Sequence, residues 1–184
     1  MAKHTTTATA KQGGRRASSD AKGVTRSATG KGKSATGVIK MLAPTAIYHA
    51  TPHERVKMIR KGVPATCLVD IIREMDISKE RLYTTLDLPR STIDNNIRNK
   101  VTLSAAHSER VIGLERLIGQ VAVMVEQSGN SRRFRFDAAR WVGEWLERPL
   151  SALGGEKPAN FMDTMEGQNL VSKLLAQSQS GAYA

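Results

Sequence analysis

A run of small and hydrogen-bonding side chains near the middle of the chain has the chemistry needed to read DNA. Its members are Arg90, Ser91, Thr92, Asn95, Asn96 and Arg98. Ile93 and Ile97 stand four residues apart within the run, so a helix here would bury one side and turn these polar side chains outward. Such side chains on a helix in the major groove donate to and accept from base edges. Asp94 is an acid in the same run, and it either accepts from a cytosine amino group or faces away from the DNA.

The residues before this run are suited to hold it in place. Ser78 can cap a helix that ends at Leu86, and Asp87-Leu88-Pro89 would lead into the second helix over residues 89–99. Leu88 would fill the space between the two helices. Two short helices joined in this way form a helix-turn-helix, although two ordinary packed helices with a polar face would give the same pattern.

Residue types that carry catalysis are present but are not grouped. The single cysteine, Cys67, lies among apolar residues, where a buried and inert thiol is expected, and the histidines lack the spaced ligands of a metal site. Gly32-Lys33-Ser34 is like the end of a phosphate-binding loop, but Ser27 stands where that motif needs its first glycine and no strand precedes it. The sequence therefore predicts no enzyme activity, no metal and no cofactor.

The charge of the chain is concentrated at its N-terminus. Lys and Arg number 28 and Asp and Glu 17, a formal net charge of +11, and residues 1–40 hold nine of the basic residues and one acid. This stretch has too few apolar residues to form a core, so we expect a disordered basic tail over residues 1–45. The tail has three possible roles. It is a solvated segment, it binds DNA phosphates without sequence specificity, or it is a transit peptide, which would have a similar composition. No apolar run is long enough to span a membrane, and the lone cysteine fits a reducing cytoplasm.

From residue 51 onward the apolar residues have helical spacing. Thr51 and Pro52 can start a helix whose apolar face includes Val56 and Ile59 and which Gly62 ends, and Pro64 is expected to open the next helix. Ser104 can cap a long helix to about residue 127, and its stripe is wide enough to need burial on two sides. The stripe consists of Val111, Leu114, Ile118, Val121 and Val125. It forms either an intramolecular core or a core that is also the seam of a homodimer.

The last fifty residues continue the helical pattern. Asp137 can cap a helix containing Trp141 and Trp145, which form either part of the core or an exposed partner surface. Leu153-Gly154-Gly155 calls for a backbone with positive φ or a close approach, and Thr164 can cap a final helix. No segment alternates with the period of a strand, so we predict an all-α fold.

Many of these positions together are similar to the antitoxins of the Xre/MbcA/ParS family. The C-terminal pattern consists of Leu103-Ser104, Ser108-Glu109-Arg110, Trp145-Leu146, Pro149, Leu153-Gly154-Gly155, Pro158, Thr164, Glu166-Gly167, Val171, Leu174 and Gly181. Gly62-Val63-Pro64 and the residues 88–92 resemble the Xre-like helix-turn-helix of the same proteins. The resemblance covers residues 50–184 and implies a helix-turn-helix domain over residues 46–100 and a toxin-binding and dimerisation domain over residues 101–184.

The resemblance also implies a function and partners. Such a protein is the antitoxin of a type II toxin–antitoxin pair, it covers the active site of a RES-domain toxin that consumes NAD, and it represses its own operon by binding operator DNA. It is expected to be a cytoplasmic homodimer that assembles with the toxin into a hetero-oligomer. The toxin-binding residues so implied are Leu153, Gly154, Gly155, Pro158, Glu166, Gly167, Gly181, Ala182, Tyr183 and Ala184. A stand-alone helix-turn-helix regulator without an enzyme partner is the alternative.

Overall fold

The computed structural model describes residues 43–128 and 136–179, and these residues are helical. The elements in chain order are α2 (Pro44–His49), α3 (Pro52–Lys61), α4 (Cys67–Met75), α5 (Lys79–Thr85), α6 (Arg90–Arg98), α7 (Ala105–Gln127), α8 (Ala138–Trp145), the 3-10 turns η3 (Ser151–Leu153) and η4 (Pro158–Phe161), and α9 (Met165–Gln179). Across these two ranges the only β pairing is a single bridge between Pro64 and Thr102. The all-α prediction is confirmed. The predicted tail lies outside the described residues except for its last three, because α2 already begins at Pro44.

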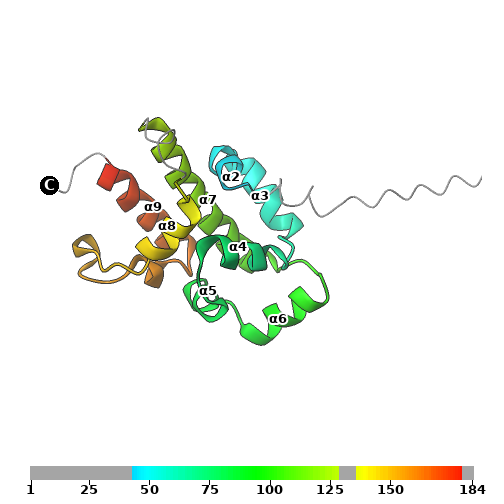
Figure 1. Ribbon diagram of the computed structural model, residues 1–184. Helices are drawn as coiled ribbons and strands as arrows, with labels where there is room; N and C mark the ends of the chain where they lie inside the picture. Colours follow the sequence, from blue (N-terminus) through cyan, green and yellow to red (C-terminus); the bar gives the residue numbers. More distant parts are fainter. Residues whose placement is uncertain (1–42, 129–135, 180–184) are drawn as a thin grey trace, which may run out of the picture. The chain divides into compact units, whose positions relative to one another are not determined.

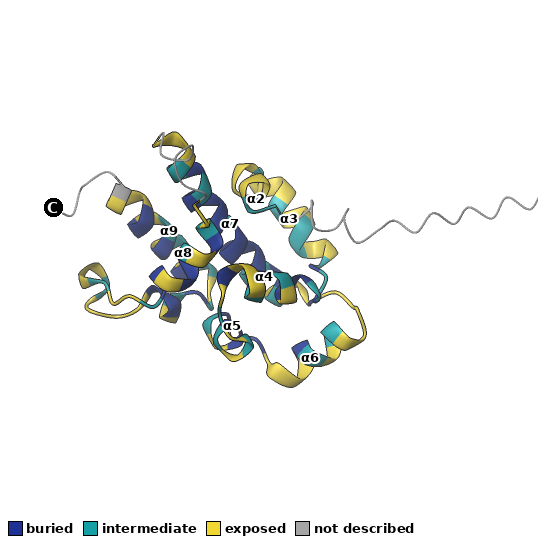
Figure 2. Cartoon of the chain, viewed as in Figure 1, coloured by how far each residue is buried: buried dark blue, intermediate teal, exposed yellow. Residues whose placement is uncertain are grey.

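The long helix α7 is the centre of the packing. α2 and α3 pack along one side of it, and α8 and α9 pack against it from the other (Figure 1). Its predicted apolar stripe is buried at Val111, Leu114, Ile118 and Val121, which are at most 4% exposed. The chain's own helices therefore cover the stripe from both sides. In Figure 2 the buried residues follow α7 and the facing sides of its neighbours, whereas α6 is largely exposed.

Most of the predicted helix ends are confirmed by the hydrogen bonds that cap them. The Thr51 hydroxyl accepts from the Glu54 backbone N–H at 3.2 Å, and the Glu54 carboxylate accepts in return from the Thr51 N–H at 2.8 Å. Ser78, Ser104 and Asp137 each accept from the backbone N–H three residues later. These short polar side chains satisfy N–H groups that have no partner inside the helix.

Two expectations for the first helices are wrong. Pro64 does not open α4, which begins at Cys67, because Pro64 belongs to an extended segment bridged to Thr102. Val56 is 41% exposed, so it is not on the buried face of α3, where Met58 and Ile59 pack against the core. None of the helices in the described ranges is long and apolar enough to cross a lipid bilayer.

The two tryptophans of the α8 region have different environments. Trp145 is buried at 7% exposure, and Trp141 stacks on it with ring centroids 5.8 Å apart and planes 12° apart. Trp141 itself is only half-buried and contacts the exposed ring of Phe136 at a centroid distance of 6.3 Å. The predicted core position is thus confirmed for Trp145, while Trp141 lies at the edge of the core.

Candidate functional site

The helix α6 is held against α5 by a group of polar contacts centred on Asp94. The Lys79 ammonium donates to both Asp94 carboxylate oxygens at 3.0 Å, and the buried Tyr83 hydroxyl donates to Oδ1 at 3.0 Å. The hydrogen bond from Lys79 is the main cause that lowers the pKa of Asp94. Asp94 therefore points at α5, and its charge is balanced by Lys79 within the helix pair, an arrangement that favours the second of its two alternatives, that it faces away from the DNA.

The six residues predicted to contact DNA lie together on α6. Five of them are exposed, and Asn96 is half-buried. Ile93, which is fully buried, fixes the opposite side of the helix in the core. Arg90 forms a 3.2 Å ion pair with Glu80, but both side chains are more than half exposed, so this pair is weak and can exchange for another anion. With Asp94 turned inward, the outward face of α6 carries arginines and neutral hydrogen-bonding groups.

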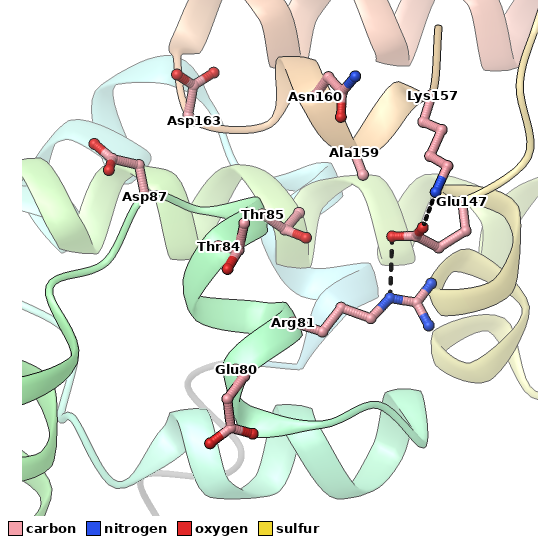
Figure 3. Close-up of a pocket in the computed structure, with 10 residues that line it drawn as sticks. All are labelled: Glu80, Arg81, Thr84, Thr85, Asp87, Glu147, Lys157, Ala159, Asn160 and Asp163. Atoms are coloured by element: carbon pink, nitrogen blue, oxygen red, sulfur yellow. Dashed lines mark hydrogen bonds and ion pairs between the residues drawn. The ribbon is translucent and has the colours of Figure 1, made fainter.

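A polar cleft of about 580 Å³ lies where α5 meets the segment after α8 (Figure 3). Arg81 reaches across it, donating through Nε to Glu147 Oε1 at 3.1 Å and through Nη2 to the Gly143 carbonyl at 2.7 Å. Lys157 donates to the other oxygen of Glu147 at 2.9 Å, and this hydrogen bond is the largest cause that lowers the pKa of Glu147. Four carboxylates and two cations line the cleft, so it does not suit a phosphate, and its Arg81 contacts fasten the helix-turn-helix to the C-terminal region.

The residues predicted to contact a toxin are divided between the surface and the interior. Gly154 and Gly155 are exposed, with φ of 66° and 88° and no atom within 4 Å of where a side chain would begin, so the positive φ itself is what requires glycine. Leu153 is half-buried and Glu166 is exposed in the first turn of α9. Pro158 and Gly167 are buried. The remaining four residues, Gly181, Ala182, Tyr183 and Ala184, lie outside the described residues.

An apolar groove of about 280 Å³ opens beside the end of α7. It is lined by Val121, Met124, Val125, Ser128, Phe136, Trp141, Leu175 and Ser178, which come from α7, α8 with the residues before it, and α9. Phe136 is 41% exposed, which is unusual for a side chain of this size next to a core. A partly exposed aromatic pair beside aliphatic side chains can accept an apolar side chain of another protein.

Four polar or charged side chains of the described residues are buried, and two of them, Gln168 and Glu115, stand out because the sequence did not predict their burial. Gln168 is 2% exposed and its amide donates to the carbonyls of Met162 at 2.8 Å and Arg110 at 3.1 Å, so it ties α9 to η4 and α7. It fits only because residue 113 is glycine, since a Cβ there would lie 1.5 Å from Gln168 Oε1. A glycine inside a long apolar helix is the signal that indicates such a close approach. Glu115 is 3% exposed in the middle of α7, and the sequence offers no signal for it beyond an acid beside the apolar stripe.

The chain matches known proteins in both of its helical regions. The family model of the antitoxin Xre-like helix-turn-helix domain matches residues 54–116, which include most of α3, all of α4 to α6 and the first half of α7. The model of the antitoxin Xre/MbcA/ParS C-terminal toxin-binding domain matches residues 134–181. A protein of Sphingobium sp. (strain YBL2), named "Prs ADP-ribosylating antitoxin", is 44% identical over 139 residues, which are 76% of this chain and 86% of that protein.

Proposed function

The chain belongs to the Xre/MbcA/ParS family of antitoxins, and from this premise we propose that it neutralises a RES-domain toxin by covering its active site and represses its own operon by binding DNA. Antitoxin function within a toxin–antitoxin system follows from the family. We propose in addition that the partner is a RES-domain toxin, that the inhibition is steric, and that the antitoxin is a homodimer that represses its operon. The name of the Sphingobium relative refers to ADP-ribosylation, which favours a partner that uses NAD for that reaction over one that degrades NAD.

The observation that carries the toxin-binding half of the proposal is the apolar groove at Phe136 and Trp141. Four of its lining residues, these two with Leu175 and Ser178, belong to the segment that matches the toxin-binding domain. An antitoxin that acts by shape needs an apolar anchor on the partner and does not need a reactive group. The exposed turn at Gly154 and Gly155 is a narrow element of the same segment, and it is suited to enter a cleft.

The toxin-binding half is tested by co-expression with the neighbouring gene and by measuring loss of NAD with and without this chain. Phe136→Ser should weaken the complex by about 1–3 kcal/mol, because it removes a half-exposed aromatic ring from the groove. Val69→Ser is the matched control, since Val69 is 49% exposed on α4 and lies outside the groove. If both variants neutralise the toxin as well as the unaltered chain does, the groove is not the contact surface. Removing Ala182–Ala184 tests the predicted toxin contacts of these residues in the same way: full neutralisation by the folded, truncated chain would show that the toxin does not need them.

The observation that supports DNA binding is the inward orientation of Asp94, which leaves the outer face of α6 free of acid. Arg90→Ala and Asn95→Ala should each weaken operator binding by roughly 1–3 kcal/mol if they contact bases. Arg148→Ala is the control, because Arg148 is similarly exposed but lies after α8. Unchanged affinity in both α6 variants would exclude this face as the reading surface. Removal of residues 1–40 should instead lower affinity for all sequences and flatten the salt dependence.

A further inference from the structure

A second groove, of about 460 Å³, lies between the helices that flank α7 and has a different chemistry. It is lined by Tyr48, Arg55, Arg116, Glu166, Asn169, Ser172 and Lys173, which belong to α2, α3, α7 and α9. Three of these seven side chains are cationic and one is acidic. The groove therefore has a net charge of +2, in contrast to the acidic cleft beside α5.

The two arginines of this groove are held by neutral partners. Arg55 donates through Nη1 to the carbonyls of Ala50 and Ile47, and Arg116 donates through Nη2 to the Asn169 side-chain oxygen at 2.7 Å. Among the ion pairs of the described residues, none includes Arg55, Arg116 or Lys173, and Glu166 lies in none of them either.

Among the cations of this groove, Arg116 is the one whose charge is disfavoured by its surroundings. Its side chain is half-buried, and this burial, followed by the charge of the neighbouring Arg55, lowers the pKa of its guanidinium. Two like charges brought together beside the core favour an anion that touches both.

We propose that this groove binds a phosphate group through Arg55, Arg116 and Lys173. A dianion matches the net charge of +2 better than a single carboxylate does, and guanidinium groups pair with phosphate oxygens in a bidentate manner. The Asn169 amide has donor capacity left, because its oxygen accepts from Arg116, and the Tyr48 hydroxyl adds a further donor. The phosphate belongs either to a small phosphorylated molecule, for which the volume is sufficient, or to a nucleic-acid backbone.

The proposal is tested on the full chain without toxin, with inorganic pyrophosphate as the ligand in titration calorimetry. We expect saturable binding that weakens with added salt, and a dissociation constant raised about tenfold or more in both Arg116→Gln and Lys173→Gln. Lys173→Gln guards against misfolding, because Lys173 is exposed and its exchange should leave the thermal unfolding temperature unchanged. Arg148→Gln is the control, because Arg148 is a surface arginine outside the groove, and this variant should bind pyrophosphate like the unaltered chain. Absence of saturable binding, or equal binding by all four proteins, overturns the proposal.

The same variants identify the source of the phosphate. Binding to a DNA duplex of about 20 base pairs is measured for each at about 50 mM salt. If Arg116→Gln and Lys173→Gln lose affinity for the duplex as strongly as they lose affinity for pyrophosphate, the groove binds the nucleic-acid backbone. Unchanged duplex binding beside lost pyrophosphate binding assigns it to a small ligand. Neither result depends on the proposed operator contact of α6, because that contact is tested separately by Arg90→Ala and Asn95→Ala.

Discussion

The buried carboxyl of Glu115 should make the stability of this protein fall as the pH rises toward neutrality. Its side chain is 3% exposed, Oε2 has no hydrogen-bond partner, and no ion pair in the described part of the chain includes it. The titratable groups that interact with it are Glu74 and Cys67 of α4, and neither is a cation. Burial first, and the Glu74 charge second, raise the pKa of Glu115 from its ordinary value of 4.5 to about 8.

The sign and size of the effect follow from proton linkage. Since the folded state holds this proton at pH values where the unfolded state has lost it, the contribution of Glu115 to stability is fully present below pH 4.5 and is lost progressively up to about pH 8. The shift corresponds to about 4–5 kcal/mol over the whole window, of which roughly 3 kcal/mol is lost by pH 7. At about 2–4 °C per kcal/mol for a chain of this size, the unfolding temperature should change by roughly 10 °C.

Glu115→Gln isolates this contribution because it keeps the shape and removes the titration. Thermal unfolding of both proteins is followed by circular dichroism between about pH 5 and pH 8. The variant should be less dependent on pH than the unaltered chain and should be the more stable of the two near pH 8. The difference between the two proteins cancels other titrating groups, such as His107, whose pKa is lowered mainly by burial. Two parallel stability curves would refute the reasoning.

Two further substitutions test the contacts that hold the helices together. Asp94→Ala removes a negative charge from α6 and yet should weaken operator binding, because Lys79 and the buried Tyr83 hydroxyl lose their acceptor; stronger binding in a gel-shift titration would show that Asp94 faces the DNA. Gly113→Ala should lower the free energy of unfolding by about 1–3 kcal/mol, because the new methyl group would lie 1.5 Å from Gln168 Oε1; denaturant unfolding measures this, and an unchanged midpoint would contradict the packing.

The parts of the fold that could be predicted are those encoded within a few neighbouring residues. The caps at Thr51, Ser78 and Ser104 depend on a hydroxyl three residues from the N–H that it accepts from, so the sequence contains the whole interaction. The positive φ of Gly154 is local for the same reason. The short helix α2, over residues 44–49, was not anticipated, because it is stabilised by packing against α7 and has no capping side chain.

The features that could not be predicted depend on residues far apart in the chain. The hydrogen bond from Gln168 to the Arg110 carbonyl joins positions 58 residues apart, and Arg81 reaches Glu147 over 66 residues. The orientation of Asp94 depends on where α5 places Lys79, so the sequence allowed both a base-reading and an inward position. The cationic groove is also invisible in the sequence, since Arg55, Arg116 and Lys173 belong to three different helices.

The helix α7 contacts both the helix-turn-helix and the segment that matches the toxin-binding domain. Its residue Arg110 donates to the carbonyls of Leu86 and Asp87, in the turn of the helix-turn-helix, while its own carbonyl accepts from Gln168 of α9. One residue, Arg110, therefore joins the segment that matches the toxin-binding domain to the turn before α6, through its backbone on one side and its side chain on the other.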